Sequence, residues 1–257
     1  MKKLLVIVMM FSLMGLLSVI AQEVKPVKTE VVDLGKGVKL EMVLIPAGKF
    51  MMGSLETEKN RGDDEIQHEV TITKPFYLGK TEVTQEQWQT VMGNTPSEIK
   101  GVRLPVTNVS WGDCQDFIKN LNNKTKGGFR LPTEAEWEYA CRGETTTAYF
   151  FGNEVTPKDI NYATSNLGKT IPVASKRANA FGLHEMHGNI WEWCEDWYGV
   201  YFEGAVKDPK GAETGSRRCV RGGSFFDAES DARSSNRYAV TPSTGNGYIG
   251  LRLARSN

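Results

Sequence analysis

The sequence contains few of the side chains on which metal and nucleophilic chemistry depend, with three histidines among 257 residues. His184 and His187 stand one residue closer together than the pair of a helical zinc motif, and Gly188 follows at once. No phosphate loop, dinucleotide fingerprint or G-x-S-x-G turn occurs. The sequence therefore does not favour a zinc enzyme, a kinase, a dehydrogenase or a serine hydrolase.

An excess of charge of either sign is also missing, since 31 basic side chains balance 31 acidic ones. A protein that binds duplex nucleic acid ordinarily presents a basic field. We therefore do not expect nucleic acid as a partner.

Long apolar runs are absent after the first 21 residues. Lys2 and Lys3 precede an apolar run from Leu4 to Ile20, and the small residue Ala21 ends it. This pattern predicts a secretory signal peptide over residues 1–21 and an exported protein, with an uncleaved membrane anchor as the alternative. No membrane span is expected after cleavage. Residues 22–39 are interpreted as an N-terminal arm, and residues 40–257 as one domain.

Cysteine is scarce, with four residues at positions 114, 141, 194 and 219. Two interpretations stay open: four buried thiols that pack as small apolar groups, or one disulfide in an oxidising compartment. If there is a bridge, the sequence favours Cys194 with Cys219, because both lie in short segments with strand character.

Helical signals are confined to the first half of the domain. Three helix starts are predicted by a hydroxyl residue with an acidic or amide residue three positions later: Thr84 with Gln87, Ser110 with Asp113, and Thr133 with Glu136. After Arg142 the sequence is rich in turn residues and is broken by short β-like runs. The expected class is α+β, with few helices and short strands.

Carboxylates gather around one turn that contains glycine, at Glu185, Glu192, Glu195 and Asp196. Turns rich in oxygen donors can hold calcium through carboxylates and backbone carbonyls. A solvated acidic turn is the alternative.

Seven motifs follow one another in an order that is more specific than any one of them. They occupy residues 42–54, 80–84, 105–111, 130–143, 188–193, 221–224 and 250–253, and include Arg-Leu-Pro-Thr-Glu-Ala-Glu-Trp, Gly-Asn-Ile-Trp-Glu-Trp and Arg-Gly-Gly-Ser. Together they resemble the formylglycine-generating enzyme, or sulfatase-modifying factor, family. The resemblance covers about residues 40–254 and implies that family's irregular α+β fold, a relative of the C-type lectin domain.

The resemblance also implies where oxidase chemistry would lie. In the family's oxidases a copper-binding cysteine pair follows the Gly-Gly-Ser motif, but here Asp227 stands three residues after Ser224 and no cysteine follows Cys219. An aspartate prefers harder metals than copper, so copper is not expected. Trp191 and Ser224 match active-site positions of the family, and the cysteine usually bridged to Cys141 would fall at Leu253.

The family's calcium site, carried over by position, would use four residues of the acidic turn. They are the side chains of Glu185 and Glu192 and the carbonyls of Gly188 and Ile190. Glu185 departs from the family's usual asparagine but keeps an oxygen ligand. Structural calcium is therefore predicted as a cofactor.

Three functions remain in competition. The first is binding of an unknown protein or small-molecule ligand through a C-terminal surface with the composition of an antibody's binding loops. The predicted binding residues are Trp191, Ser224, Phe226, Asp227, Asp231, Asn236, Tyr238, Thr241, Asn246 and Tyr248. A subgroup of the family varies such residues by a retroelement, and residues 226–249 have a matching composition. The alternatives are an oxidase acting on sulfatase cysteines and a structural component of the cell envelope.

Overall fold

The computed structural model describes residues 27–201 and 204–257. The predicted signal peptide lies outside these residues. No helix in the described ranges is long and apolar enough to cross a membrane.

All three predicted helix starts are confirmed. The helices are α1 (Gln85–Met92), α2 (Trp111–Lys124) and α3 (Glu134–Arg142), and each begins with the expected capping box. Left-handed glycines end α1 and α3, as the sequence favours at helix C-termini. Two short 3-10 helices follow, η1 (Ala163–Ser165) and η2 (Glu229–Ala232).

The largest sheet has five strands in the order β1-β2-β5-β12-β6. Its strands are β1 (Thr29–Gly35), β2 (Val38–Ile45), β5 (Phe76–Gly79), β6 (Phe129–Arg130) and β12 (Ala254–Ser256). The predicted arm over residues 22–39 is therefore wrong from Thr29 onward, because β1 pairs antiparallel with β2 from Thr29 opposite Val43 to Gly35 opposite Val38. Most of β1 is exposed at the sheet edge, so its apolar pattern is weak.

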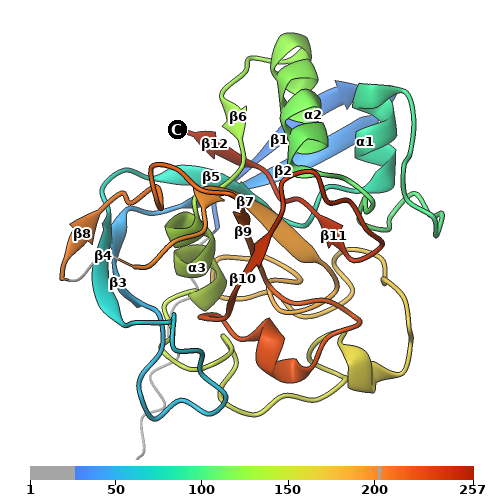
Figure 1. Cartoon of the computed structure of the whole chain (residues 1–257). Helices are drawn as coiled ribbons and strands as arrows, with labels where there is room; N and C mark the ends of the chain where they lie inside the picture. The colour runs from blue at the N-terminus through green and yellow to red at the C-terminus, as the bar shows by residue number, and fades with distance from the viewer. Residues whose placement is uncertain (1–26, 202–203) are drawn as a thin grey trace, which may run out of the picture.

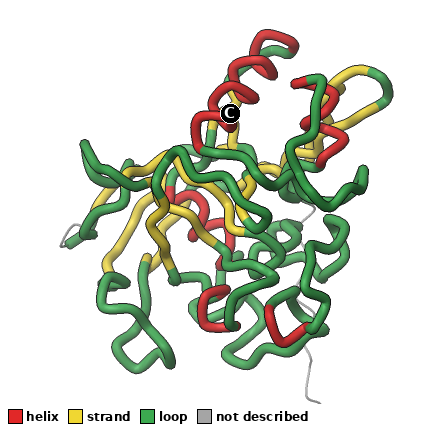
Figure 2. Tube along the Cα trace, turned by 45° about the vertical axis from the view of Figure 1, so that its right-hand side comes forward, coloured by secondary structure: helices red, strands yellow, loops and turns green. Residues whose placement is uncertain are grey.

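Two smaller sheets complete the domain. The four-stranded sheet has the order β10-β9-β7-β11, and the three-stranded sheet has the order β3-β4-β8. Their strands are β3 (Gly48–Met52), β4 (His68–Ile72), β7 (Trp191–Trp197), β8 (Val206–Lys207), β9 (Arg218–Arg221), β10 (Arg237–Val240) and β11 (Ile249–Gly250). Figure 1 shows that β10 and β9 lead into η2 and its loops on the side of the molecule away from α1 and α2. Much of that side is loop in Figure 2.

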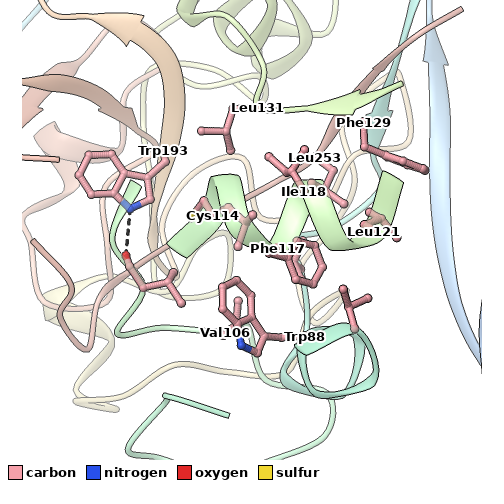
Figure 3. Packing of buried hydrophobic residues seen from close by; sticks show 14 of the residues in the cluster. Trp88, Val106, Cys114, Phe117, Ile118, Leu121, Phe129, Leu131, Trp193 and Leu253 are labelled. Atoms are coloured by element: carbon pink, nitrogen blue, oxygen red, sulfur yellow. Dashed lines mark hydrogen bonds between the residues drawn. The ribbon is translucent and has the colours of Figure 1, made fainter. Parts of the chain in front are cut away.

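The core lies between the sheets and the helices. Trp88 of α1 stacks on Phe117 of α2 with ring centroids 4.8 Å apart, and Trp193 of β7 donates its indole N–H to the Val109 carbonyl at 3.0 Å (Figure 3). A second apolar cluster forms around α3, with Trp137 fully buried. Burial of large aromatic side chains of this kind is the main stabilising contribution in a chain with so little regular structure.

All four cysteines are free and buried, in agreement with the first of the two interpretations. Cys194 and Cys219 do lie in the paired strands β7 and β9 and contribute to the same apolar cluster.

Candidate functional site

The C-terminal surface is built on Trp191, the first residue of β7. Its backbone N–H donates to the Tyr248 carbonyl at 2.9 Å, and its neighbour in the parallel β7–β11 ladder is Ile249. The indole is 5% exposed and donates its N–H to Asp227 Oδ2 at 2.8 Å. Trp191 therefore connects β7 to the loop that carries Asp227 and to the loop that carries Tyr248.

The Gly-Gly-Ser motif brings Ser224 and Asp227 to this tryptophan. Gly222 and Gly223 have φ values of 101° and 71°, and a Cβ on Gly223 would approach the backbone of Asp231 and Ala232 to 2.9 Å. Only glycine fits such a turn without strain. The Ser224 hydroxyl then donates to the same Asp227 oxygen that accepts from Trp191. The predicted residues Trp191, Ser224 and Asp227 thus form one connected group.

Three aromatic rings cover this group. Phe226 and Tyr238 are 70% and 58% exposed, whereas Tyr248 is half-buried against the core. Phe226 stacks on Tyr248 with centroids 5.9 Å apart, and Tyr238 leans on Trp191 at 5.7 Å. We call Phe226, Asp227, Tyr238 and Tyr248, with Trp191 beneath them, the aromatic face.

The other predicted binding residues support the neighbouring loops. Asn236 donates to the Asp231 carbonyl at 2.9 Å, and Asn246 Oδ1 accepts from the Tyr248 amide at 3.1 Å. Burial and the nearby charge of Asp227 raise the pKa of Asp231. Thr241 is exposed in the turn after β10, where its carbonyl accepts from the Thr244 amide.

The four residues predicted for calcium lie in one turn, but the two carboxylates have other partners. Glu185 accepts from the backbone amides of residues 174–176 at 2.8–2.9 Å. Glu192 accepts from the Arg252 guanidinium at 2.8–3.1 Å and from the Trp137 indole at 2.6 Å.

Within the described ranges, no group of three or more His, Cys, Asp or Glu side chains is arranged to hold a metal ion. Among the described residues near this turn, the buried side-chain acceptors without a partner are Glu82 Oε2 and Asn161 Oδ1, and neither belongs to Glu185 or Glu192. As arranged, the predicted carboxylates of Glu185 and Glu192 do not fit a calcium ion, because binding would require Glu192 to release Arg252. A calcium titration of the folded chain tests this predicted site, which would also use the Gly188 and Ile190 carbonyls.

Sequence reasoning missed a set of buried ion pairs that hold the surface loops in place. Each joins an arginine of the last 37 residues to a distant glutamate: Arg221 to Glu138 at 2.5 Å, Arg233 to Glu65 at 2.6 Å, Arg237 to Glu134 at 2.7 Å, and Arg252 to Glu192 at 2.8 Å. Arg221 also donates to the carbonyls of residues 234–236. The only sequence signal is an arginine inside an apolar β-like run, as at Arg221 and Arg252.

A cavity of about 460 Å³ lies beside η2. Glu229 and Arg233 line one side, and residues 55–60 and 146–155 line the rest. Arg233 is buried and bound to Glu58 and Glu65, so it presents no free charge to this cavity.

Comparison with known proteins identifies the family of this chain. Residues 29–257 match the sulfatase-modifying factor enzyme 1-like domain. The formylglycine-generating enzyme of Streptomyces coelicolor is 30% identical over 82% of this chain and 88% of its own length. The serine/threonine-protein kinase pkn1 of Chlamydia caviae is 33% identical over 84% of this chain, which spans only 38% of that kinase.

Two solved structures are similar over nearly their whole length. Treponema denticola variable protein 1 aligns with a TM-score of 0.80 and 28% identity, covering 89% of this chain and 99% of its own. PvdO from Pseudomonas aeruginosa aligns with a TM-score of 0.79 and 29% identity, covering 89% and 98%. The expected α+β fold and the resemblance read from the seven motifs are confirmed, and the chain belongs to the sulfatase-modifying factor (formylglycine-generating enzyme) family.

Proposed function

We propose that this chain is an exported binding domain that recognises its ligand with the aromatic face. The observation that carries the proposal is the exposure of Phe226 and Tyr238 above a fixed base of Trp191, Asp227 and Ser224. Exposed aromatic side chains with polar neighbours are typical of recognition surfaces, because they offer a large contact area at low entropic cost.

Similarity to a protein named a variable protein supports the choice of this surface. Residues 226–249 form loops, the 3-10 helix η2, the strand β10 and the start of β11, whereas Arg233 and Arg237 within them are fixed by buried glutamates. The exposed positions can therefore change without disturbing the loop anchors. If the surface is diversified, copies of this sequence from close relatives will differ at Phe226, Tyr238 and Thr241 but not at the two arginines.

A photo-crosslinking experiment tests the binding proposal in the source cell. A benzophenone amino acid replaces Tyr238 in one variant and Val102, which is 64% exposed in the loop after α1, in the control. We expect a discrete crosslinked species from position 238 and none from position 102. Equal labelling at the two positions, or none at 238, would contradict a ligand on the aromatic face.

An oxidase is the second candidate, because the Streptomyces coelicolor relative is a formylglycine-generating enzyme. The chain has no cysteine after Cys219, and Asp227 is bound by Trp191 and Ser224. Thiolates select copper, so a site without them is poorly suited to it. We expect incubation with copper, oxygen and a cysteine-containing sulfatase peptide to give no formylglycine detectable by mass spectrometry. Formation of formylglycine would support the oxidase hypothesis instead.

Export is proposed from the apolar run at residues 4–20. N-terminal sequencing of the protein from an extracytoplasmic fraction is expected to begin at Gln22. A start at Met1 in that fraction would instead support the uncleaved anchor.

A further inference from the structure

The exposed charges of the C-terminal segment that carries most of the aromatic face are of one sign. Residues 222–250 contain three carboxylates, at Asp227, Glu229 and Asp231, and all three are partly exposed. The two basic residues of the segment, Arg233 and Arg237, are buried and paired with glutamates. The segment therefore presents only negative charge to a ligand.

Asp227 is fixed in place with one oxygen available. Its Oδ2 accepts from the Trp191 indole at 2.8 Å and from the Ser224 hydroxyl. No protein donor in the described part of the chain reaches Oδ1. A carboxylate held by two donors loses little entropy when it accepts a further charged donor.

The rings beside this carboxylate suit a cation. The face of an aromatic ring attracts ammonium and guanidinium groups. Two exposed rings are near the carboxylate: Phe226 precedes Asp227 in the chain, and Tyr238 packs on Trp191, which donates to Asp227. The chain already uses this interaction internally, since the Arg218 guanidinium lies 3.5 Å from the Trp197 ring centroid and 4.0 Å from that of Trp111.

From this combination we propose that the occupant of the aromatic face is a lysine- or arginine-bearing segment of a partner protein. The inference rests on the proposed binding function and names its ligand class. A peptide fits better than a small free amine, because the rings form two separate pairs, Phe226 with Tyr248 and Tyr238 with Trp191, rather than one cage. A cation on Asp227 and an adjoining side chain on the second ring pair would use both.

The test is a titration of the full chain with three seven-residue probes. The basic probe is acetyl-Gly-Arg-Gly-Lys-Gly-Arg-Gly-amide, the neutral one carries citrulline and acetyl-lysine instead, and the acidic one carries glutamate. Binding is followed by calorimetry and by the NMR signal of the Trp191 indole N–H. We expect the basic probe to bind at least about 10-fold more tightly than the neutral one, since a cation–π contact with a charge pair contributes about that factor.

Variants separate the role of the face from general electrostatics. Asp227→Asn should weaken the basic probe about 10-fold, while Asp116→Asn, which removes an exposed carboxylate from α2, should leave it unchanged. Phe226→Leu tests the ring without disturbing Asp227, and a melting curve confirms that each variant is folded. Equal weakening by both aspartate variants would overturn the proposal, because it would mean that only net charge matters.

The two levels of the proposal fail in different ways. If the neutral probe binds as tightly as the basic one and Phe226→Leu weakens both, the face is a binding site and the cationic ligand is wrong. If the amide of N-acetyl-lysine alone binds as tightly as the peptide, the ligand is a small amine and the peptide assignment falls. If no probe binds and position 238 gives no crosslink, the proposed function fails as well.

Discussion

The interior of the domain and its aromatic face distribute the same kinds of side chain in opposite ways. In the last 37 residues Arg221, Arg233, Arg237 and Arg252 are buried, whereas Phe226 and Tyr238 are among the most exposed large hydrophobic side chains of the described residues. Charged residues are ordinarily outside and aromatic ones inside. This reversed distribution indicates that the two regions have different roles. The buried arginines fix loops that lack regular hydrogen bonding, and the exposed aromatic rings are available to contact another molecule.

The comparison has an energetic side. A buried ion pair adds little net stability, but removal of one partner leaves an uncompensated charge in the interior. An exposed ring makes few contacts with the rest of the protein, so its removal changes the free energy of unfolding little. Changes to the two regions should therefore have very different effects on stability and on binding.

The largest effect is expected for Arg252→Met. The variant removes the charged partner of the buried Glu192 carboxylate and the guanidinium that donates to the carbonyls of Gly79 and His184. We expect a loss of about 3–5 kcal/mol in the free energy of unfolding, measured by urea denaturation. Arg255→Met is the matched control, because Arg255 pairs with the partly exposed Glu30 and its loss should cost about 1 kcal/mol or less. Equal losses for the two variants would remove the distinction between interior and surface pairs.

The next comparison is between aromatic residues at the two depths. Trp191→Ala empties a buried site and should cost about 3 kcal/mol or more of the free energy of unfolding, whereas Phe226→Ala and Tyr238→Ala should change it by less than about 1 kcal/mol. Tyr248→Ala should fall between them, because its ring packs partly against the core. Thermal melts of the four variants measure the series. Unfolding of the Tyr238→Ala variant would place that ring in the core instead.

Helix starts could be predicted from the sequence because their determinants lie within four residues. Thr133 and Glu136 cap α3 as expected, and the bonds involved never leave the first turn. The strand β1 was missed because its evidence is its partner β2, whose pairing the local pattern of a mostly exposed strand does not reveal.

The same limit explains the two outcomes at the candidate site. Ser224 and Asp227 lie three residues apart, so the Gly-Gly-Ser turn brings them together locally, whereas Trp191 reaches Asp227 across 36 residues and was assigned to the site only through the family motifs. Glu192 was assigned to calcium because the acidic turn around it is visible locally, while its partner Arg252 stands 60 residues further along the chain. Buried ion pairs between residues so far apart in the sequence can be identified only from the tertiary structure.

Acid tests the interior pairs without removing a side chain. Burial alone would raise the pKa of Glu65, but the hydrogen bonds and charge of Arg233 lower it to about 2. A folded pKa below the unfolded one gives stability that is present above about pH 4.5 and is lost as the pH falls toward 2. Between pH 5.5 and pH 3.5 we expect the free energy of unfolding of the wild type to fall about 1 kcal/mol more than that of Glu65→Gln, because each pH unit below the unfolded pKa is worth about 1.4 kcal/mol. Parallel slopes would mean that the pair is not formed in solution.

The smallest effect is expected from calcium, which tests whether the acidic turn is a metal site or part of the ion-pair interior. A ligand that binds only the folded state raises the melting temperature with the logarithm of its concentration. Because Arg252 and Trp137 already occupy both oxygens of Glu192, and three amides occupy Glu185, we expect millimolar calcium to leave the wild-type melt unchanged relative to magnesium. Arg252→Met frees Glu192, so calcium should stabilise that variant if the carbonyls of Gly188 and Ile190 are free to complete the site. A rise of the wild-type melt that Glu192→Ala abolishes would establish the calcium site and show that Arg252 yields to the metal.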